Sequence, residues 1–377
     1  MKEARLRAGT FDGDEILEFR APYIGVTKFL SGLEVDGKLL FPEFRVDSYW
    51  SLRQESWTKP LESGETLRDR FTDDEIDIFF EGDTFDEKLS KLKLLNPTES
   101  KQLRDLMTNK WDFQAAAGSA VHYILQQYFT KDPDTGKILG DSERNLIIDK
   151  INQNIEKDLK EELGSRYREG LYNDDTIEQA IIYADQLKGE LRKLHGQNCE
   201  FYPELGVSSP MHKETPGKPN ILMGYIDLAV LDENGKINYY DYKTSPKEYS
   251  NFGSAKKLAY TYQLAAYGKL FKQYGLDYKD SDVGILPIQF KELKLSNPEE
   301  AHRNPRKAKF EYKTIGWGTE LIKREVKQKM QAVDSQGNQP VLDNLDDYLP
   351  EDLILDIPTE HCVENVEEQI KTWFPDY

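Results

Sequence analysis

Cysteine and long apolar stretches are scarce in this sequence of 377 residues. Its two cysteines, Cys199 and Cys362, are too few for a disulfide framework, a cysteine-based zinc site or a four-cysteine iron–sulfur cluster. Mean hydropathy is −0.71, and no apolar run approaches the roughly 18–20 residues that cross a bilayer. The basic residues near the N-terminus are followed by acids, unlike a secretory or transit signal. We therefore expect a soluble protein of a reducing, intracellular compartment, with no membrane partner.

A positive net charge is also lacking. The chain has 50 Lys and Arg against 68 Asp and Glu, a net charge of −18, which argues at first against nucleic acid because phosphate binding depends on Lys and Arg. The distribution is uneven: residues 1–240 carry 31 − 45 = −14, residues 241–330 carry 18 − 11 = +7, and residues 331–377 carry 1 − 12 = −11. A basic stretch thus lies between two acidic ones.

Aromatic residues, at 11% of the chain, predict a well-packed core. Helical spacing of apolar residues predicts helices at about 115–129, 143–193 and 254–274, and the acidic stretch 61–110 is also helix-friendly. Short runs rich in Ile, Val, Leu and Tyr predict strands at 200–208, 221–231, 236–244 and 283–290. This order predicts an α/β core. We divide the chain into an N-terminal elaboration (1–110), a core (111–330) and an acidic C-terminal segment (331–377).

The segment 224–245 predicts a β-hairpin whose turn decides its chemistry. A three-residue loop at 233–235, closed by a glycine in the left-handed region, pairs residues whose numbers sum to 468. Asp227 then lies opposite Asp241, and Lys243 shares their face. A two-residue turn at 234–235 would instead pair 227 with 242 and send Asp227 to the other face. The loop type therefore decides whether these three groups can act together.

Two facing carboxylates repel each other unless a cation or a proton neutralises them. Mg²⁺ prefers oxygen ligands and takes one or two carboxylates together with phosphate oxygens. A bound ion can polarise a phosphoryl oxygen and activate water, and a nearby lysine can orient that water and stabilise the growing charge. The alternative is that Asp241 and Lys243 form a surface pair on an edge strand while Asp227 caps a bend. Charges inside otherwise apolar strands are uncommon, so the pattern favours metal-assisted phosphodiester hydrolysis.

Three motifs resemble one known family. The order G-Y-I-D at 224–227, D-Y-K at 241–243 and Q-L-A-A-Y at 263–267 resembles the RecB-type branch of the PD-(D/E)XK nucleases, in which an Asp, a D/E-x-K and a Q-x-x-x-Y follow one another. The resemblance implies a restriction-endonuclease-like core, with a central mixed sheet flanked by helices and a helical N-terminal elaboration. It also implies DNA as the substrate and Mg²⁺ or Mn²⁺ as the cofactor.

Upstream residues extend the resemblance to about residues 20–290. Gly118 followed by His122 is similar to the Gly–His helix of such proteins, and Trp111 and residues 26–30 resemble segments that precede this helix in stand-alone, phage-type members. The catalytic residues that the resemblance implies are Asp227, Asp241, Lys243, Gln263 and Tyr267. The metal ligands that it implies are His122, Glu204, Asp227, Asp241 and Tyr242.

Each supporting residue also has a plainer interpretation. His122 alone would be a half-buried core histidine, and Glu204 a surface strand residue. By resemblance, Gln263 would buttress Lys243 or the metal-bound water, and Tyr267 would touch the DNA backbone. Alternatively, both belong to a core stripe that has these further members: Tyr262, Ala266 and Leu270. Lys256-Lys257 and the basic cluster 302–313 are weak candidates for phosphate contacts, because charge runs usually mark a solvated face.

The resemblance implies an exonuclease that trims DNA ends in recombination, repair or phage DNA processing, in the cytoplasm of a bacterium or of a phage-infected cell. The chain has no G-x-x-x-x-G-K-[ST] motif, so it contains no helicase motor, and it lacks the cysteine cluster of the CRISPR-associated members. Two alternatives stay open: a restriction- or junction-type endonuclease, and a non-catalytic DNA- or protein-binding scaffold. The second is disfavoured because Asp227, Asp241 and Lys243 are all present. An oligomer and a recombination partner protein also stay open.

Overall fold

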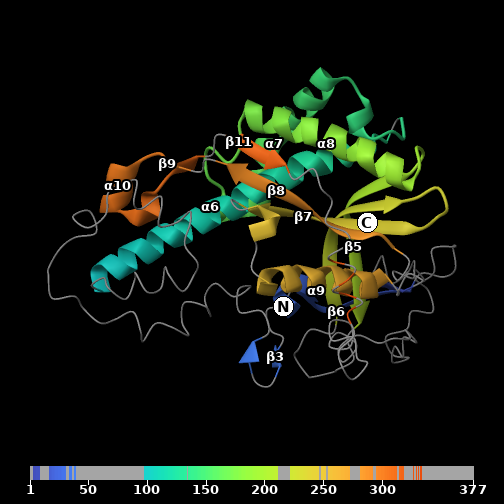
Figure 1. Cartoon of the computed structure of the whole chain (residues 1–377), viewed down its shortest axis with the longest axis horizontal. Helices are drawn as coiled ribbons and strands as arrows, with labels where there is room; N and C mark the ends of the chain where they lie inside the picture. Colours follow the sequence, from blue (N-terminus) through green and yellow to red (C-terminus); the bar gives the residue numbers. More distant parts are fainter. Residues whose placement is uncertain are drawn as a thin grey trace.

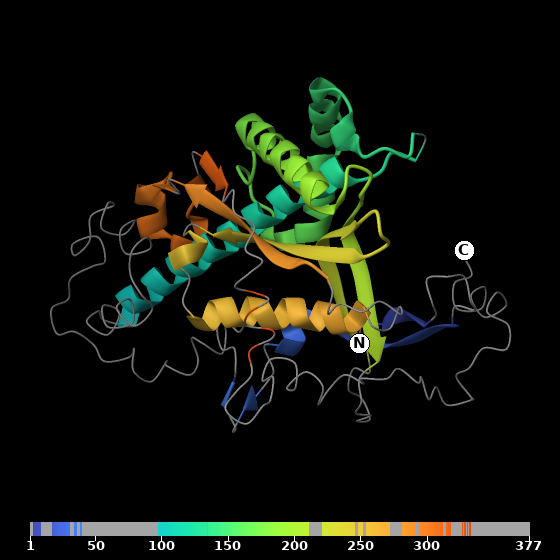
Figure 2. The ribbon, with the colours of Figure 1, turned by 45° about the vertical axis from the view of Figure 1, so that its right-hand side comes forward.

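The computed structural model describes residues 3–8, 17–30, 34–35, 38–39, 97–133, 135–210, 221–245, 248–251, 254–271, 281–291, 294–311, 314–317 and the single residues 326, 328, 330 and 332. This part of the chain forms a central sheet with helices on both faces (Figures 1 and 2). None of the described helices is long and apolar enough to cross a membrane.

The sheet has seven strands. Their order is β1 (Glu3–Ala8), β2 (Leu17–Gly25), β6 (Ile221–Leu231), β7 (Ile237–Ser245), β8 (Val283–Lys291) and β11 (Thr314–Trp317), and β5 (Glu200–Pro210) pairs with β6 off this path. The β2–β6 and β7–β8 pairs are parallel and the other pairs are antiparallel. Two short ribbons, β3 (Glu34–Val35) with β4 (Lys38–Leu39) and β9 (Lys294–Leu295) with β10 (Phe310–Glu311), lie outside this sheet. The predicted α/β architecture with a mixed sheet is confirmed.

The β6–β7 hairpin has the predicted three-residue loop. Its register pairs Leu228 with Tyr240 and Leu231 with Ile237, so that partner numbers sum to 468. Gly235 has a φ of +78°, and its N–H donates a hydrogen bond of 3.0 Å to the carbonyl of residue 232. Only glycine adopts this conformation without a steric penalty. The alternative two-residue turn is therefore wrong.

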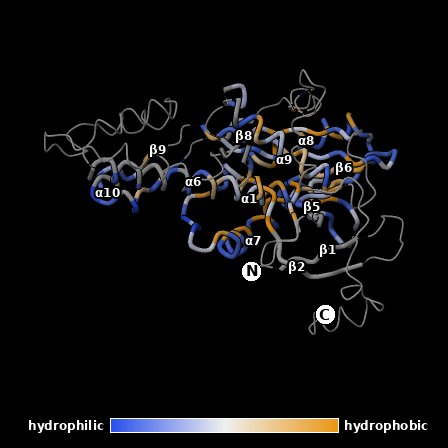
Figure 3. Tube along the Cα trace, turned by 90° about the horizontal axis from the view of Figure 1, so that it is seen from below, coloured by the Kyte–Doolittle hydropathy of each residue, from blue (hydrophilic) through white to orange (hydrophobic). Residues whose placement is uncertain are grey.

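Two helical layers cover the sheet (Figures 1 and 2). On one face lie α6 (Pro97–Phe129), α7 (Arg144–Leu163) and α8 (Asp174–His195), and on the other lie α1 (Val26–Leu30) and α9 (Ser254–Phe271). Tyr240 and Tyr242 of β7 face the first layer, and Ile237 and Tyr239 face the second, as strand alternation requires. The hydrophobic residues accordingly gather in the middle of the molecule, around β5, β6, α1 and α7 (Figure 3).

Several element boundaries differ from the prediction. The helix expected at 115–129 begins earlier, at Pro97, and runs without a break across residue 110. The region expected to be helical from 143 to 193 is two helices, because Gly164 ends α7 at a φ of +53° and Asn173 caps α8 by accepting the Thr176 N–H. The expected helices within 61–96 and nearly all of the acidic segment 331–377 lie outside the described residues. The division of the chain at residues 110 and 330 stays a prediction.

Candidate active site

The ladder between β6 and β7 ends inside the sheet. In the described residues their pairing ends with Leu228 and Tyr240, whereas β7 continues to pair with β8 as far as Ser245. At its other end β6 pairs with β2 through residues 221–223. Residues 224–227 of β6 and 241–245 of β7 therefore border a gap in the ladder, which we call the fork. Side chains from both faces of the sheet can enter it.

The strands change face at the fork. In β6, Ile226 packs toward α9 but Leu228 packs toward α6–α8, although two residues that are two positions apart normally share a face. The register between β5 and β6 is the same before and after this point, so no residue is inserted. The continued register places Glu204 opposite Asp227, and Glu204 is the one described non-glycine residue with a positive φ, at 49°. Such a conformation costs about 1–3 kcal/mol and is concentrated at functional sites.

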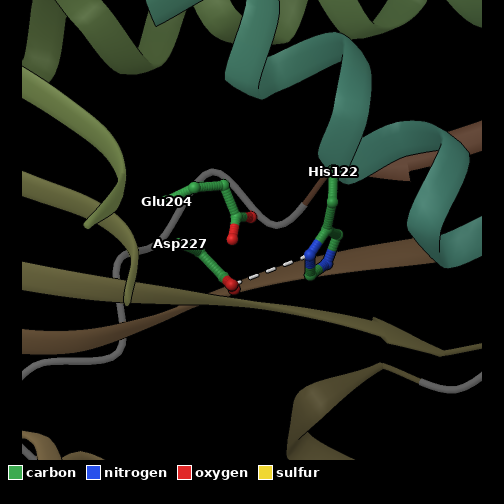
Figure 4. A group of neighbouring side chains, drawn as sticks. All are labelled: His122, Glu204 and Asp227. Atoms are coloured by element: carbon green, nitrogen blue, oxygen red, sulfur yellow. Dashed lines mark ion pairs between the residues drawn. The ribbon is translucent and has the colours of Figure 1, made fainter. Parts of the chain in front are cut away.

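Three side chains from different elements converge here (Figure 4). His122 of α6, Glu204 of β5 and Asp227 of β6 each offer one ligand atom, and these atoms lie within 4.8 Å of one another. The His122 Nδ1 lies 3.8 Å from an Asp227 carboxylate oxygen. The Asp227 carboxylate also accepts the backbone N–H of Tyr242, at 2.5 Å. The Asp227 carboxylate thus accepts a backbone N–H at the point where the β6–β7 ladder is interrupted.

Asp241 and Lys243 follow on β7, on the side of α9, whereas Asp227 meets His122 of α6. The predicted cross-strand pair of Asp227 and Asp241 on one face is wrong, because the β6–β7 ladder ends at Leu228 and Tyr240 and β6 changes face there.

Asp241 is 2% exposed and its carboxylate forms an ion pair with the Lys243 ammonium. Because both side chains of this pair are largely buried, the alternative of a surface pair on an edge strand is wrong. The Lys243 Nζ lies 4.7 Å from the centre of the Tyr260 ring, and the Lys256 Nζ lies 5.8 Å from the same ring. Two ammonium groups are thus held beside one aromatic ring of α9.

Burial sets the protonation of this group. It raises the pKa of both Asp227 and Asp241 to about 6, against the opposing effect of Lys243. The pKa of Glu204 is raised to about 8, first by burial and then by the nearby Asp227 carboxylate. Burial lowers the pKa of His122 to about 4, so its imidazole is neutral at pH 7. The site therefore combines a neutral nitrogen ligand with crowded carboxylates that only a cation or protons can neutralise.

Two glycines allow the helices to approach the fork closely. A Cβ at Gly118 of α6 would lie 2.5 Å from the Thr244 Oγ1, and a Cβ at Gly224 of β6 would lie 2.4 Å from a ring carbon of Tyr267. These are the glycines of the G-x-x-x-H and G-Y-I-D segments. Each explains in steric terms why glycine stands at that position.

Gln263 and Tyr267 lie one helical turn apart on α9. The Gln263 amide donates a hydrogen bond of 2.9 Å to the Tyr267 hydroxyl, and both residues are buried. Burial, followed by the Asp241 and Asp227 charges, raises the pKa of Tyr267 well above its usual range. The pair therefore lies beside the carboxylates, but the core-stripe interpretation also fits, because its other three members are buried as well. Their catalytic roles stay a prediction.

Tyr242 contributes through its ring and its backbone. The ring meets His122 edge-on, with 5.4 Å between the ring centres, and its buried hydroxyl has no hydrogen-bond partner among the described residues. Burial raises the pKa of this hydroxyl well above its usual range, so the phenol stays protonated. A metal-ligand role for Tyr242 stays a prediction.

Two further residues of the site were not predicted. The Glu162 carboxylate, at the end of α7, accepts a hydrogen bond from the Ser119 side chain of α6. Its charge also contributes to the raised pKa of Glu204. No sequence pattern connects Glu162 to the other acids. Tyr260 could have been found, because it precedes Gln263 and Tyr267 at helical spacing on one face of α9.

The basic cluster 302–313 lies elsewhere. It includes parts of α10 (Pro298–Arg303) and the 3₁₀ helix Pro305–Lys307, beside the N-terminal part of α6 (Figure 1). Within it, Arg306 pairs with Asp105 at 3.7 Å and Lys307 pairs with Glu300 at 3.4 Å. The side chain of Trp111 lies outside the described residues.

The donor set fits a hard divalent ion. Carboxylate oxygens suit Mg²⁺ and Mn²⁺, and an imidazole is acceptable to Mn²⁺. Burial raises the pKa of Asp227 and, together with the nearby Asp227 charge, that of Glu204, so ionising both carboxylates here is costly and a bound cation would offset that cost. The residues present therefore agree with a divalent metal site.

The family model of the PD-(D/E)XK nuclease superfamily matches residues 99–349, and the chain belongs to this superfamily. Nucleases of this superfamily use divalent metal ions. Among solved structures, the crystal structure of SSO0001 is similar at 12% sequence identity and a TM-score of 0.20, over 55% of this chain and 77% of that one. No curated protein sequence matches significantly.

Proposed function

We propose that this chain is a Mg²⁺- or Mn²⁺-dependent deoxyribonuclease of the RecB-type branch that degrades DNA from its ends. The observation that carries the proposal is the buried pair of Asp241 and Lys243 at the fork, beside the group formed by His122, Glu204 and Asp227. A buried carboxylate–ammonium pair is a weak source of stability. Its position next to a candidate metal site supports a chemical role instead.

The proposed roles follow from position. His122, Glu204 and Asp227 would hold the ion, with Asp241 as a further ligand from the neighbouring strand. The bound ion would polarise a phosphoryl oxygen and make a coordinated water easier to deprotonate. Lys243, fixed between Asp241 and the Tyr260 ring, would orient the attacking water and stabilise charge on the phosphate.

Local positive charge supports an approach path for DNA within an acidic protein. Lys256 shares the Tyr260 ring with Lys243, and Lys257 lies 4.9 Å from the centre of the Tyr249 ring. Both lysines belong to the first turn of α9, which packs against the fork. We propose that they contact the phosphates that flank the cleavage position.

The resemblance to the RecB-type branch supports degradation of DNA from its ends. The Asp at 227, the D-Y-K at 241–243 and the Q-x-x-x-Y at 263–267 follow in the order of the RecB-type branch, and the chain carries no motor motif. A stand-alone exonuclease for recombination, repair or phage DNA processing combines these two features. Assembly into an oligomer and work with a recombination partner protein would belong to such a role.

One experiment tests the activity, its metal and its mode. Linear and covalently closed circular DNA of one sequence are incubated with Mg²⁺, Mn²⁺ or EDTA, using wild type, Asp241→Ala and Lys243→Ala. We expect loss of the linear substrate alone, abolished by EDTA and by either substitution. Lys193→Ala, on the exposed side of α8, is the matched control that should cleave as wild type does.

The other outcomes discriminate the alternatives. Cleavage of the circular substrate would indicate an endonuclease. DNA binding without cleavage under any ion would indicate a scaffold on the same fold. Full activity of Asp241→Ala and Lys243→Ala would show that the proposed site is not the catalytic one.

A further inference from the structure

Tyr225 is an aromatic side chain at the fork that the proposed chemistry does not use. It is 52% exposed, more than any other large hydrophobic side chain in the described part of the chain. Its neighbours in β6, Gly224 and Ile226, are both buried. An exposed tyrosine between buried neighbours, on the strand that carries Asp227, is a candidate for binding, because tyrosine combines an apolar ring with a polar tip and is enriched at interfaces.

The Tyr225 ring packs against a glycine of the neighbouring strand. Tyr225 pairs with Gly206 of β5, and a Cβ built on Gly206 would lie 3.4 Å from a ring carbon of Tyr225. The ring therefore lies against the bare backbone of Gly206, which is itself exposed. This support leaves the ring accessible and limits its movement.

The ring also lies next to the candidate metal group on the same two strands. Tyr225 precedes Asp227 by two residues, and Gly206 follows Glu204 by two. Two residues of a strand span about 6.7 Å. The ring is therefore close enough to a phosphate held at Asp227 and Glu204 to meet the base of a neighbouring nucleotide.

The direction of the ring agrees with this placement. Ile226, Leu205 and Val207 pack toward α1 and α9, so strand alternation turns Tyr225 and Gly206 to the opposite face. The same face receives His122 from α6. Tyr225 and the imidazole thus border the fork from one side of the sheet.

We propose that Tyr225 is a stacking platform for an unpaired nucleobase of the nucleotide beside the phosphate that is cleaved. Every base has a flat π face, so such a platform tolerates any sequence. A paired base has both faces covered by its neighbours in the helix, so the platform favours single-stranded or frayed ends. This inference rests on the proposed nuclease function and specifies the form of its substrate.

The test pairs a protein change with a substrate change. Wild type, Tyr225→Phe and Tyr225→Ala are compared on a single-stranded oligonucleotide and on the same oligonucleotide with abasic nucleotides at its ends. With the intact substrate, Tyr225→Ala should lose about tenfold to a hundredfold in kcat/KM, and Tyr225→Phe should stay near wild type. With the abasic substrate, wild type and Tyr225→Ala should be equal, since no base is present to stack.

Tyr202→Ala is the matched control. Tyr202 is a partly buried tyrosine of the same β5–β6 sheet, in contact with Lys131 and Glu200, and its loss should not depend on the presence of a base. Equal losses by Tyr225→Ala on both substrates, or no loss, would overturn the platform.

Binding of both labelled oligonucleotides in EDTA separates the two proposals. A base-dependent loss of binding by Tyr225→Ala, with no cleavage by wild type under any ion, would overturn the nuclease but keep the platform.

Discussion

The two ends of the β6–β7 hairpin differ in almost every respect. At the closed end, residues 228–231 and 237–240 pair in full, and their side chains are mostly apolar and buried. At the fork, pairing between the same strands stops, and the side chains include two carboxylates, a lysine and an exposed tyrosine. Both ends belong to the same two strands. The charges stand where the ladder is interrupted.

This difference has a physical reason. A buried carboxylate needs donors or a cation, and a complete ladder offers no backbone N–H to it. By interrupting the ladder, the fork makes the Tyr242 N–H available to Asp227. The gap also admits His122 from one face and leaves Lys243 on the other. The closed end is a fully paired and mostly apolar ladder, and the fork positions the groups that the proposed function uses.

The largest expected effect concerns Asp227, which has two separable tasks. Asp227→Asn keeps an oxygen that can accept the Tyr242 N–H but removes the charge, whereas Asp227→Ala removes both. We expect both variants to lose at least about a thousandfold in kcat/KM, because the charge holds the ion. In EDTA, Asp227→Ala should be about 1–3 kcal/mol less stable than Asp227→Asn in denaturant unfolding, because it leaves a donor unpaired. Substantial cleavage by Asp227→Asn would mean that the fork carries no metal chemistry.

The second prediction concerns the approach of α6 to the fork. Gly118→Ala places its Cβ against the Thr244 Oγ1, so α6 must shift and carry His122 with it. We expect a loss of stability of about 1–3 kcal/mol together with a loss of cleavage. Thr244→Ala removes the clashing oxygen and leaves only the Cβ, at 3.5 Å. The double variant should therefore recover both stability and activity, and failure to recover would show that Gly118 serves another purpose.

The third prediction uses the pKa of Glu204, which is raised from 4.5 to about 8. Between these values the folded protein keeps a proton that the unfolded chain has released, so the stability of the metal-free protein falls as pH rises. The ion needs the ionised carboxylate, so its affinity should rise by up to about tenfold per pH unit from pH 6.5 to 8.5. Calorimetric titration with Mn²⁺ should show this rise in affinity with pH for wild type. Glu204→Gln should bind Mn²⁺ more weakly, and its affinity should change less with pH.

The range from pH 6.5 to 8.5 limits the contribution of the other ligands to the measured pH dependence. The pKa of His122 is lowered to about 4, so its effect has the opposite sign: stability is lost as pH falls from 6.5 toward 4. Asp227 and Asp241, with pKa values raised to about 6, are mostly ionised above pH 6.5. A slope in Glu204→Gln equal to that of wild type would assign the proton to another group.

The sequence predicts the closed end better than the fork. Local turn chemistry locates the turn of the hairpin, and short apolar runs locate its strands. The choice between a two-residue and a three-residue loop, and the order of the strands in the sheet, come from the structure. The change of face at Glu204 could not be foreseen, since a positive φ at a glutamate has no sequence signal. The contribution of Glu162 depends on the packing of α7 against α6, which residue spacing does not determine. The break between α7 and α8 had a signal, in Gly164 and the Asn173 cap, that apolar periodicity concealed.

The smallest expected effect is a control on the closed end. Ile237 is buried against α9 and pairs with Leu231 next to the turn, away from the fork. Ile237→Val removes one buried methylene group and should cost about 0.5–1.5 kcal/mol in denaturant unfolding. Because the fork has its own hydrogen bonds and helix contacts, kcat/KM per folded molecule should stay within about twofold of wild type. A clear loss of cleavage under conditions where the variant is fully folded would mean that packing at the closed end affects the geometry of the fork. Stability and function would then not be divided between the two ends of the hairpin.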